Sequence, residues 1–229
     1  HRYRTRVEAT AEPAAGVVAG DLYLVGGGDP VLATEAYAAR SPQQDRAHTR
    51  LEDLADAVAD AGVSRVEGGV VGDEARYSTE RYVADWPSRY IDQNQTGPLS
   101  ALSVNDGFES FPSADDPGAP LRASPDPAGQ AAAVFTVLLR ERGVEVVGPP
   151  STGAAPANTV TIAKVRSKKL PQILAQLLTF SDNQTAELIL REIGRAQGGE
   201  GTTPAGAGAV EQVLTQAGQP YTVFTPYKN

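Results

Sequence analysis

The residues best suited to chemistry lie together in the tripeptide Ser181-Asp182-Asn183. Ser-x-Asn is one of three short motifs found in serine acyl-transfer sites, and the other two are Ser-x-x-Lys and Lys-Thr-Gly. Acyl transfer needs a proton donor near the leaving group and an amide that orients the acyl chain. A serine hydroxyl and an asparagine carboxamide two positions apart can supply this pair of groups. The tripeptide is therefore the candidate catalytic element of the sequence.

The other two motifs are absent from these 229 residues. The lysines are Lys164, Lys168, Lys169 and Lys228. None of them lies three positions after a serine, and none is followed by Thr-Gly. The sequence thus carries the proton-relay and orienting motif of an acyl-transfer site without its nucleophile. Losing the nucleophile from such a site costs on the order of 10⁶ in rate.

The elements that must position this tripeptide are two amphipathic helices. One apolar stripe comprises Leu170, Ile173, Leu174, Leu177 and Leu178, and the next comprises Ala186, Ile189, Leu190 and Ile193. Ser181 falls at their junction and Gln184 lies three positions later, which is the pattern of a capping box. A purely structural interpretation therefore stays open, in which Ser181 only caps a helix. Ser181→Ala would then cost about 1 kcal/mol of stability and nothing else.

Strands and helices alternate in the first two thirds of the sequence. Strands are predicted over 3–9 and 17–25, and the second ends in the turn Gly26-Gly27-Gly28-Asp29-Pro30. No Gly-Lys-Ser/Thr comes after this turn, so we interpret it as structural rather than phosphate-binding, with Asp29 capping the next segment of the chain. Two units of helix, glycine and strand are also predicted. The first has a helix from Leu51 to Val58, Gly62 and a strand at 64–71. The second has a helix starting at Asp126-Pro127, Gly143 and a strand at 144–147. Segments 112–127 and 149–158 are predicted loops.

The amino-acid composition argues against several classes of function. The net charge of -8 argues against nonspecific nucleic-acid or anionic-membrane binding, and no apolar run is long enough to span a bilayer. Cysteine is absent, which excludes thiol catalysis and cysteine-based zinc sites. His1 and His48 are the only histidines, so a histidine metal cluster is impossible. A triad built on His48 is unsupported because no nucleophile elbow is present. We expect neither a metal ion nor an organic cofactor.

Three segments, in order, resemble one family. Segments 20–30, 98–106 and 181–188 resemble the D-alanyl-D-alanine carboxypeptidase family of class C low-molecular-mass penicillin-binding proteins. The resemblance covers roughly positions 1–219 and implies an α+β fold: part of a penicillin-binding (β-lactamase-like) core with an inserted mixed α/β domain. It assigns 1–20 to a strand region adjoining the core, 21–160 to the insertion and 161–219 to the core helices that carry Ser-x-Asn. The tail 220–229 does not match the family, and the sequence is expected to be an internal fragment.

The resemblance also implies a function and roles for individual residues. It implies a serine-type D-Ala-D-Ala carboxypeptidase or endopeptidase that acts on peptidoglycan stem peptides outside the cytoplasmic membrane and is acylated by β-lactams. Ser181 would pass a proton to the leaving D-alanine nitrogen, Asn183 would hold a substrate carbonyl, and Asp182 would be a spacer. Trp86 and Tyr90 would line the substrate side-chain pocket, although a single tryptophan also serves as a core anchor.

Because two motifs are missing, we expect this polypeptide by itself to be inactive towards D-Ala-D-Ala and penicillin. The alternative is a noncatalytic cell-wall or protein-binding module derived from such an enzyme.

Overall fold

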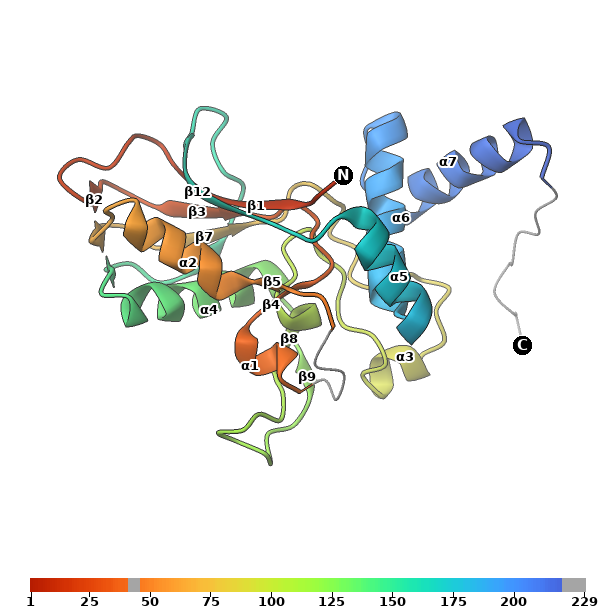
Figure 1. Ribbon diagram of the computed structural model, residues 1–229, viewed down its shortest axis with the longest axis horizontal. Coiled ribbons are helices and arrows are strands. Elements are labelled where there is room, and N and C mark those ends of the chain that lie inside the picture. Colours follow the sequence, from red (N-terminus) through yellow and green to blue (C-terminus); the bar gives the residue numbers. More distant parts are fainter. Residues whose placement is uncertain (41–45, 220–229) are drawn as a thin grey trace.

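A five-stranded mixed sheet forms the centre of the computed structural model, which describes residues 1–40 and 46–219 (Figure 1). The strand order is β11-β7-β3-β1-β12, with bounds β1 Arg4–Ala9, β3 Leu22–Val25, β7 Val70–Asp73, β11 Ser151–Thr152 and β12 Val160–Arg166. The β11, β7 and β3 strands are parallel, whereas β1 is antiparallel to both of its neighbours. The predicted first strand is thus confirmed as β1, while β12 was not predicted.

Two amphipathic helices cover one face of this sheet (Figure 1). They are α2 (Leu51–Asp60) and α4 (Pro127–Glu141), the two helices that the apolar spacing predicts. Asp126 caps α4 by accepting a hydrogen bond from the Gly129 amide at 3.0 Å. Their apolar stripes pack with the inward side chains of β1 and β3 into the main core. Phe135 of α4 is fully buried there.

Two predicted strands are each divided by glycines. Segment 17–25 forms a two-residue strand and then β3, and segment 64–71 contributes to two strands separated at Gly68-Gly69. Both glycines at that break pack against other backbone. Gly68 packs against Gly20, and a Cβ on Gly69 would lie 2.1 Å from the Pro149 carbonyl oxygen. The predicted loop 149–158 is likewise wrong in part, since it contains β11.

The remaining short elements lie around this layer. A parallel three-stranded sheet comprises β10 (Glu145–Val146), β6 (Arg65–Val66) and β2 (Val17–Val18). Two strand pairs join β4 (Leu32–Ala33) to β5 (Thr49–Arg50), and β8 (Phe108–Ser110) to β9 (Arg122–Ala123). The short helices are α1 (Glu35–Ala38), α3 (Arg89–Asp92) and the 3₁₀ turn η1 (Asn105–Gly107).

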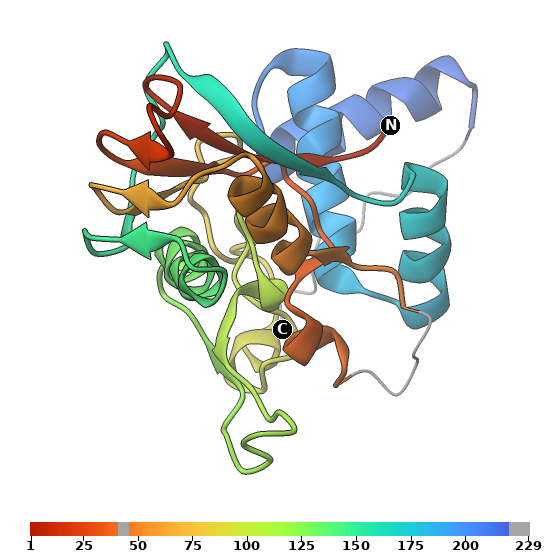
Figure 2. The ribbon, with the colours of Figure 1, turned by 60° about the vertical axis from the view of Figure 1, so that its left-hand side comes forward.

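Three helices form the end of the molecule away from α2 and α4 (Figures 1 and 2). They are α5 (Leu170–Phe180), α6 (Asn183–Gly198) and α7 (Thr203–Gln216), of which α7 was not predicted. The α6 and α7 helices cross closely through Gly194 and Gly206. A Cβ on Gly206 would lie 2.1 Å from the Leu190 carbonyl oxygen, so no larger residue fits this crossing.

The predicted α+β fold class is confirmed. The main sheet takes β1 from 1–20, β3 and β7 from 21–160 and nearly all of β12 from 161–219, so hydrogen-bonded strands join all three predicted regions. Their boundaries therefore stay predictions. None of the helices within 1–40 and 46–219 is long and apolar enough to cross a bilayer.

Candidate active site

The Ser-x-Asn tripeptide forms the tight turn between α5 and α6. Ser181 ends α5 in the left-handed conformation, with φ 54° and ψ 49°. Asp182 begins α6 as its N-cap and accepts a hydrogen bond from the Thr185 amide at 3.0 Å. The predicted capping box on Ser181 is therefore wrong, because an N-cap residue needs an extended backbone and Ser181 is left-handed. The side chains of Ser181 and Asn183 are both exposed on this turn.

Asp182 also links the turn to Arg46, which lies outside α5 and α6. Its carboxylate makes an ion pair with Arg46, whose guanidinium also lies 5.6 Å from the centre of the Phe180 ring. The family resemblance implies a spacer role for Asp182. The structure shows it as a helix cap and an ion-pair partner, which together hold the backbone between Ser181 and Asn183.

Gln184, directly after the motif, anchors the turn to the 97–107 segment. Its side-chain oxygen accepts from the Gly97 amide at 2.9 Å, and its side-chain nitrogen donates to the Asp106 carbonyl at 2.9 Å. Gln184 is only 6% exposed, so both bonds are protected from water. Gly97 has no room for a side chain, because a Cβ there would lie 1.7 Å from the same Asp106 oxygen. The capping-box pattern predicts a local role for Gln184 at the helix N-terminus instead of these long-range hydrogen bonds.

Replacing Gln184 by alanine is expected to lower the free energy of unfolding by about 1–3 kcal/mol, because a buried donor and a buried acceptor lose their partner. Urea denaturation checks this value. Gln197→Ala is the matched control, since Gln197 lies on the same helix but is exposed. Equal losses in the two variants would show that Gln184 does not anchor the turn.

The anchoring segment is itself held in an unusual conformation. Asn105 and Asp106 are consecutive non-glycine residues with positive φ, 57° and 54°. The Asn105 carboxamide oxygen stabilises this conformation by accepting from the Thr34 amide at 2.8 Å. The Tyr37 hydroxyl donates to the Asp106 carboxylate at 2.8 Å. Burial, together with the nearby Asp182 charge, raises the pKa of Asp106 to about 6.

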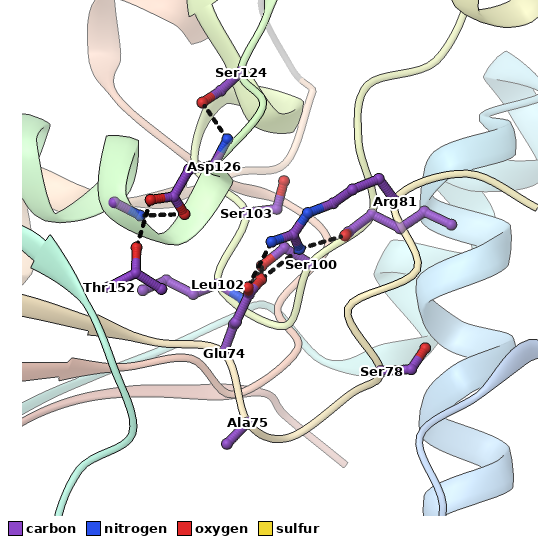
Figure 3. Close-up of polar contacts among 12 residues, drawn as sticks. Glu74, Ala75, Ser78, Arg81, Ser100, Leu102, Ser103, Ser124, Asp126 and Thr152 are labelled. Carbon is purple, nitrogen blue, oxygen red and sulfur yellow. Dashed lines mark hydrogen bonds and ion pairs between the residues drawn. The ribbon is translucent and has the colours of Figure 1, made fainter.

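A second anchor holds this segment at Ser100, between the two positions that Gln184 contacts. Figure 3 shows Arg81 and Ser100 converging on Glu74. Both terminal nitrogens of Arg81 lie 2.6 Å from the Glu74 carboxylate oxygens, and the Ser100 hydroxyl donates to Glu74 at 2.6 Å. The 97–107 segment is thus tied at Ser100 to the loop after β7 and at Gly97 and Asp106 to α6.

A cavity of about 270 Å³ lies beside the turn. Its polar lining comes from Tyr37, Arg40, Arg46, His48, Asp106 and Gln176. The buried His48 Nε2 has no hydrogen-bond partner among the described residues, and its Nδ1 lies 3.4 Å from the Arg46 carbonyl oxygen. A triad through His48 thus finds no support in the described contacts.

The structure pairs Trp86 with Tyr90 but does not join them to the motif. Their rings meet edge to face with centroids 6.1 Å apart. Trp86 packs against the buried cluster that contains Tyr77, Leu99 and Leu188, which fits the core-anchor interpretation. In the described part of the chain, no hydrogen bond or ring contact connects this pair to Ser181. The assignment of Trp86 and Tyr90 to a substrate pocket stays a prediction.

The turn at Gly26–Pro30 agrees with its structural interpretation, in which glycine accepts a positive φ and Asp29 caps the next segment of the chain. Gly28 has φ +74°, and Asp29 accepts from the Val31 amide at 3.1 Å. Burial raises the pKa of Asp29 to about 6. Gly27 serves a different purpose, because a Cβ there would lie 1.9 Å from the Arg4 carbonyl oxygen. The turn therefore packs its backbone onto β1.

Comparison with solved structures defines the class of fold. Penicillin binding protein 4 (dacB) from Haemophilus influenzae superimposes with a TM-score of 0.77 at 16% identity, covering 97% of this chain and 59% of that one. A structure of the same protein complexed with a novel β-lactam gives a TM-score of 0.61. The described strands and helices therefore have the fold of part of a penicillin-binding protein.

Sequence comparison supplies the family. The model of the D-Ala-D-Ala carboxypeptidase 3 (S13) family matches residues 1–115 and 109–222, so the chain belongs to this family. The D-alanyl-D-alanine carboxypeptidase of Actinomadura sp. (strain R39) is 26% identical over 95% of this chain. Carboxypeptidase DacB of Mycolicibacterium smegmatis is 32% identical over 86% of it. The chain spans 50% and 40%, respectively, of the lengths of these relatives.

Proposed function

We propose that the α5–α6 turn is the Ser-x-Asn element of a serine-type D-Ala-D-Ala carboxypeptidase or endopeptidase that acts on peptidoglycan stem peptides. Family membership supports this proposal, but the observation that carries it is the turn itself. Ser181 and Asn183 present their side chains to solvent, while Asp182 and Gln184 hold the backbone between and after them. A pre-positioned donor and amide are the groups that acyl transfer requires.

In this proposal the two exposed side chains act on different parts of the substrate. The Ser181 hydroxyl passes a proton to the leaving D-alanine nitrogen as the peptide bond breaks. The Asn183 carboxamide donates to a substrate carbonyl and keeps the acyl chain in line. The nucleophile and its lysine do not occur in these 229 residues. We therefore propose that a polypeptide of this sequence alone is not acylated by β-lactams.

The proposed site of action is outside the cytoplasmic membrane, where stem peptides and β-lactams meet such enzymes. The rival is a noncatalytic cell-wall or protein-binding module derived from a carboxypeptidase. An upstream Ser-x-x-Lys and a downstream Lys-Thr-Gly in the native polypeptide would favour the enzyme, and their absence from the native polypeptide would favour this rival.

A fluorescent-penicillin gel of the protein, immunoprecipitated from its source cells with an antibody against this chain, decides between them. The carboxypeptidase predicts a labelled band well above 23.9 kDa. An unlabelled band near 23.9 kDa would instead support the noncatalytic module.

If the band is labelled, substitutions in that protein test the motif. Ser181→Ala is expected to slow acylation by roughly 10²–10⁴, the usual contribution of a positioned proton-transfer group. Thr179→Ala is the control, because Thr179 is an exposed hydroxyl residue on α5 that donates to the Ala175 carbonyl of its own helix. Equal acylation rates in the two variants would contradict the role of Ser181.

A further inference from the structure

A basic hollow lies on the face of the sheet opposite α2 and α4. It is a cavity of about 310 Å³, and its basic lining residues are His1, Arg2, Arg4, Arg6 and Arg76. Arg4 and Arg6 alternate along β1 with the buried Thr5 and Val7, so they point away from the main core. The hollow is notable in a chain with a net charge of -8.

The neighbouring strand extends this basic surface. In the antiparallel β1–β12 pair, Arg4 lies opposite Arg166 and Arg6 lies opposite Lys164. Directly opposite residues project from the same face, so the four side chains form a two-by-two array. Successive cations along each strand are about 7 Å apart, because a strand rises about 3.4 Å per residue.

Few carboxylates compensate these charges. Glu8 pairs with Arg6 and Glu192 pairs with Arg76. Within 1–40 and 46–219, no carboxylate oxygen lies within 4.0 Å of the charged nitrogens of Arg4, Lys164 or Arg166. Like charges directly opposite each other destabilise a sheet. By this rule the uncompensated Arg4–Arg166 pair disfavours folding, and a bound anion would relieve the repulsion.

Protection of a sheet edge is the structural alternative. Lysine on an edge strand discourages edge-to-edge aggregation, and β12 is the edge strand of the main sheet. This alternative explains Lys164. It does not explain Arg4 and Arg6, because β1 is an interior strand paired on both sides.

We propose that the basic hollow and the two-by-two array beside it together bind a linear phosphate-bearing polymer. The cations of this combined surface are Arg2, Arg4, Arg6, Arg76, Lys164 and Arg166. Guanidinium groups bind phosphate oxygens through paired hydrogen bonds, and all but one of the cations of this surface are arginines. The two-by-two array continues into the basic lining of the hollow, so the surface offers more cations than a single phosphate can contact and fits a chain of phosphates better. At physiological salt the distant acidic residues are screened over about 8 Å, so the local charge decides binding.

The test measures binding of fluorescently labelled linear polyphosphate to the whole chain by anisotropy, over a range of salt concentrations. The informative variant is Arg4→Gln with Arg166→Gln. Its matched control is Arg122→Gln with Arg195→Gln, which removes the same charge from exposed positions elsewhere. We expect the first pair to lower the slope of log affinity against log salt by about 1 per lost phosphate contact, and the control to leave it unchanged.

Thermal unfolding of the same variants separates binding from structure. Relief of the like-charge pair should leave the Arg4/Arg166 variant at least as stable as the parent while its polyphosphate binding falls. Absence of binding by the parent chain, or equal losses in both variants, would overturn the proposal. Aggregation of the Arg4/Arg166 variant without any binding by the parent would assign the array to edge protection.

Two other probes test the chemistry of the partner. Polyglutamate carries carboxylates in place of phosphates, and phosphatidylglycerol vesicles present phosphates as a surface rather than a chain. Tighter binding of polyglutamate would refute the preference for phosphate, and tighter binding of vesicles would refute a linear partner. None of these measurements uses acyl transfer, so their outcome is independent of the proposed carboxypeptidase function.

Discussion

Replacing Arg191 by alanine is expected to lower the free energy of unfolding by about 3–5 kcal/mol, the usual cost of breaking a buried charged pair. The Arg191 side chain is fully buried in α6. Its guanidinium lies 3.3 Å from the Ser78 carbonyl, 3.4 Å from the Glu80 carboxylate and 3.9 Å from Glu187. Burial lowers the pKa of Arg191 from its ordinary value, and the Glu187 and Glu80 carboxylates act against that shift.

The loss arises because the alanine variant leaves Glu187 buried without its cation and opens a cavity between α6 and the 74–81 loop. Urea denaturation measures the loss. Arg195→Ala is the control, because Arg195 lies one turn further along the same helix and is exposed. A change below about 1 kcal/mol in the Arg191 variant would show that the loop is held to α6 by its other contacts.

The second large effect is expected in the main core. Phe135→Ala should lower the free energy of unfolding by about 3–5 kcal/mol, because a buried ring is lost and the space around it refills only in part. Phe135 has no exposed surface, and it packs in the cluster that joins α4 to α2 and the sheet. Val137 lies two positions along the same helix with 53% of its surface exposed. Val137→Ala should therefore change stability by no more than about 0.5 kcal/mol.

Differential scanning calorimetry of the two α4 variants compares these effects directly. Similar melting temperatures for the Phe135 and Val137 variants would contradict the burial of Phe135.

Periodicity predicted the long helices because their apolar stripes are strong local signals. Leu51, Leu54, Ala55 and Val58 are all buried at the spacing that marks α2. The same rule could not find β12, because the pairing register shifts at Ile162, and the adjacent apolar residues Ile162 and Ala163 break the strict alternation that marks a strand. Strand β12 is held by pairing with β1, and such distant pairing leaves no local trace. Helix α7 was missed because its glycines and alanines give a weak apolar stripe.

The motif could be found from sequence, but the way it is held could not. Ser181 and Asn183 are recognisable by residue type and spacing alone. The contacts behind them join Gln184 to Gly97 and Asp182 to Arg46, which are far apart in the chain. The sequence also suggested the wrong helix cap, since Ser181 and Asp182 are both good capping residues. Only the left-handed backbone at Ser181 decides between them.

The pairing of β1 with β12 brings together positions that are 164 residues apart, as in the hydrogen bond from the Tyr3 amide to the Ser167 hydroxyl. The segment between β1 and β12 therefore leaves the sheet at one strand and returns to it at the neighbouring strand. Strands β3 and β7 lie within this segment and complete the same sheet, so the segment cannot be exchanged without replacing the strand that pairs with β1. Any replacement segment would also have to restore the contacts with α6, which include Gly97 and Asp106 with Gln184, Arg46 with Asp182, and Ser78 with Arg191.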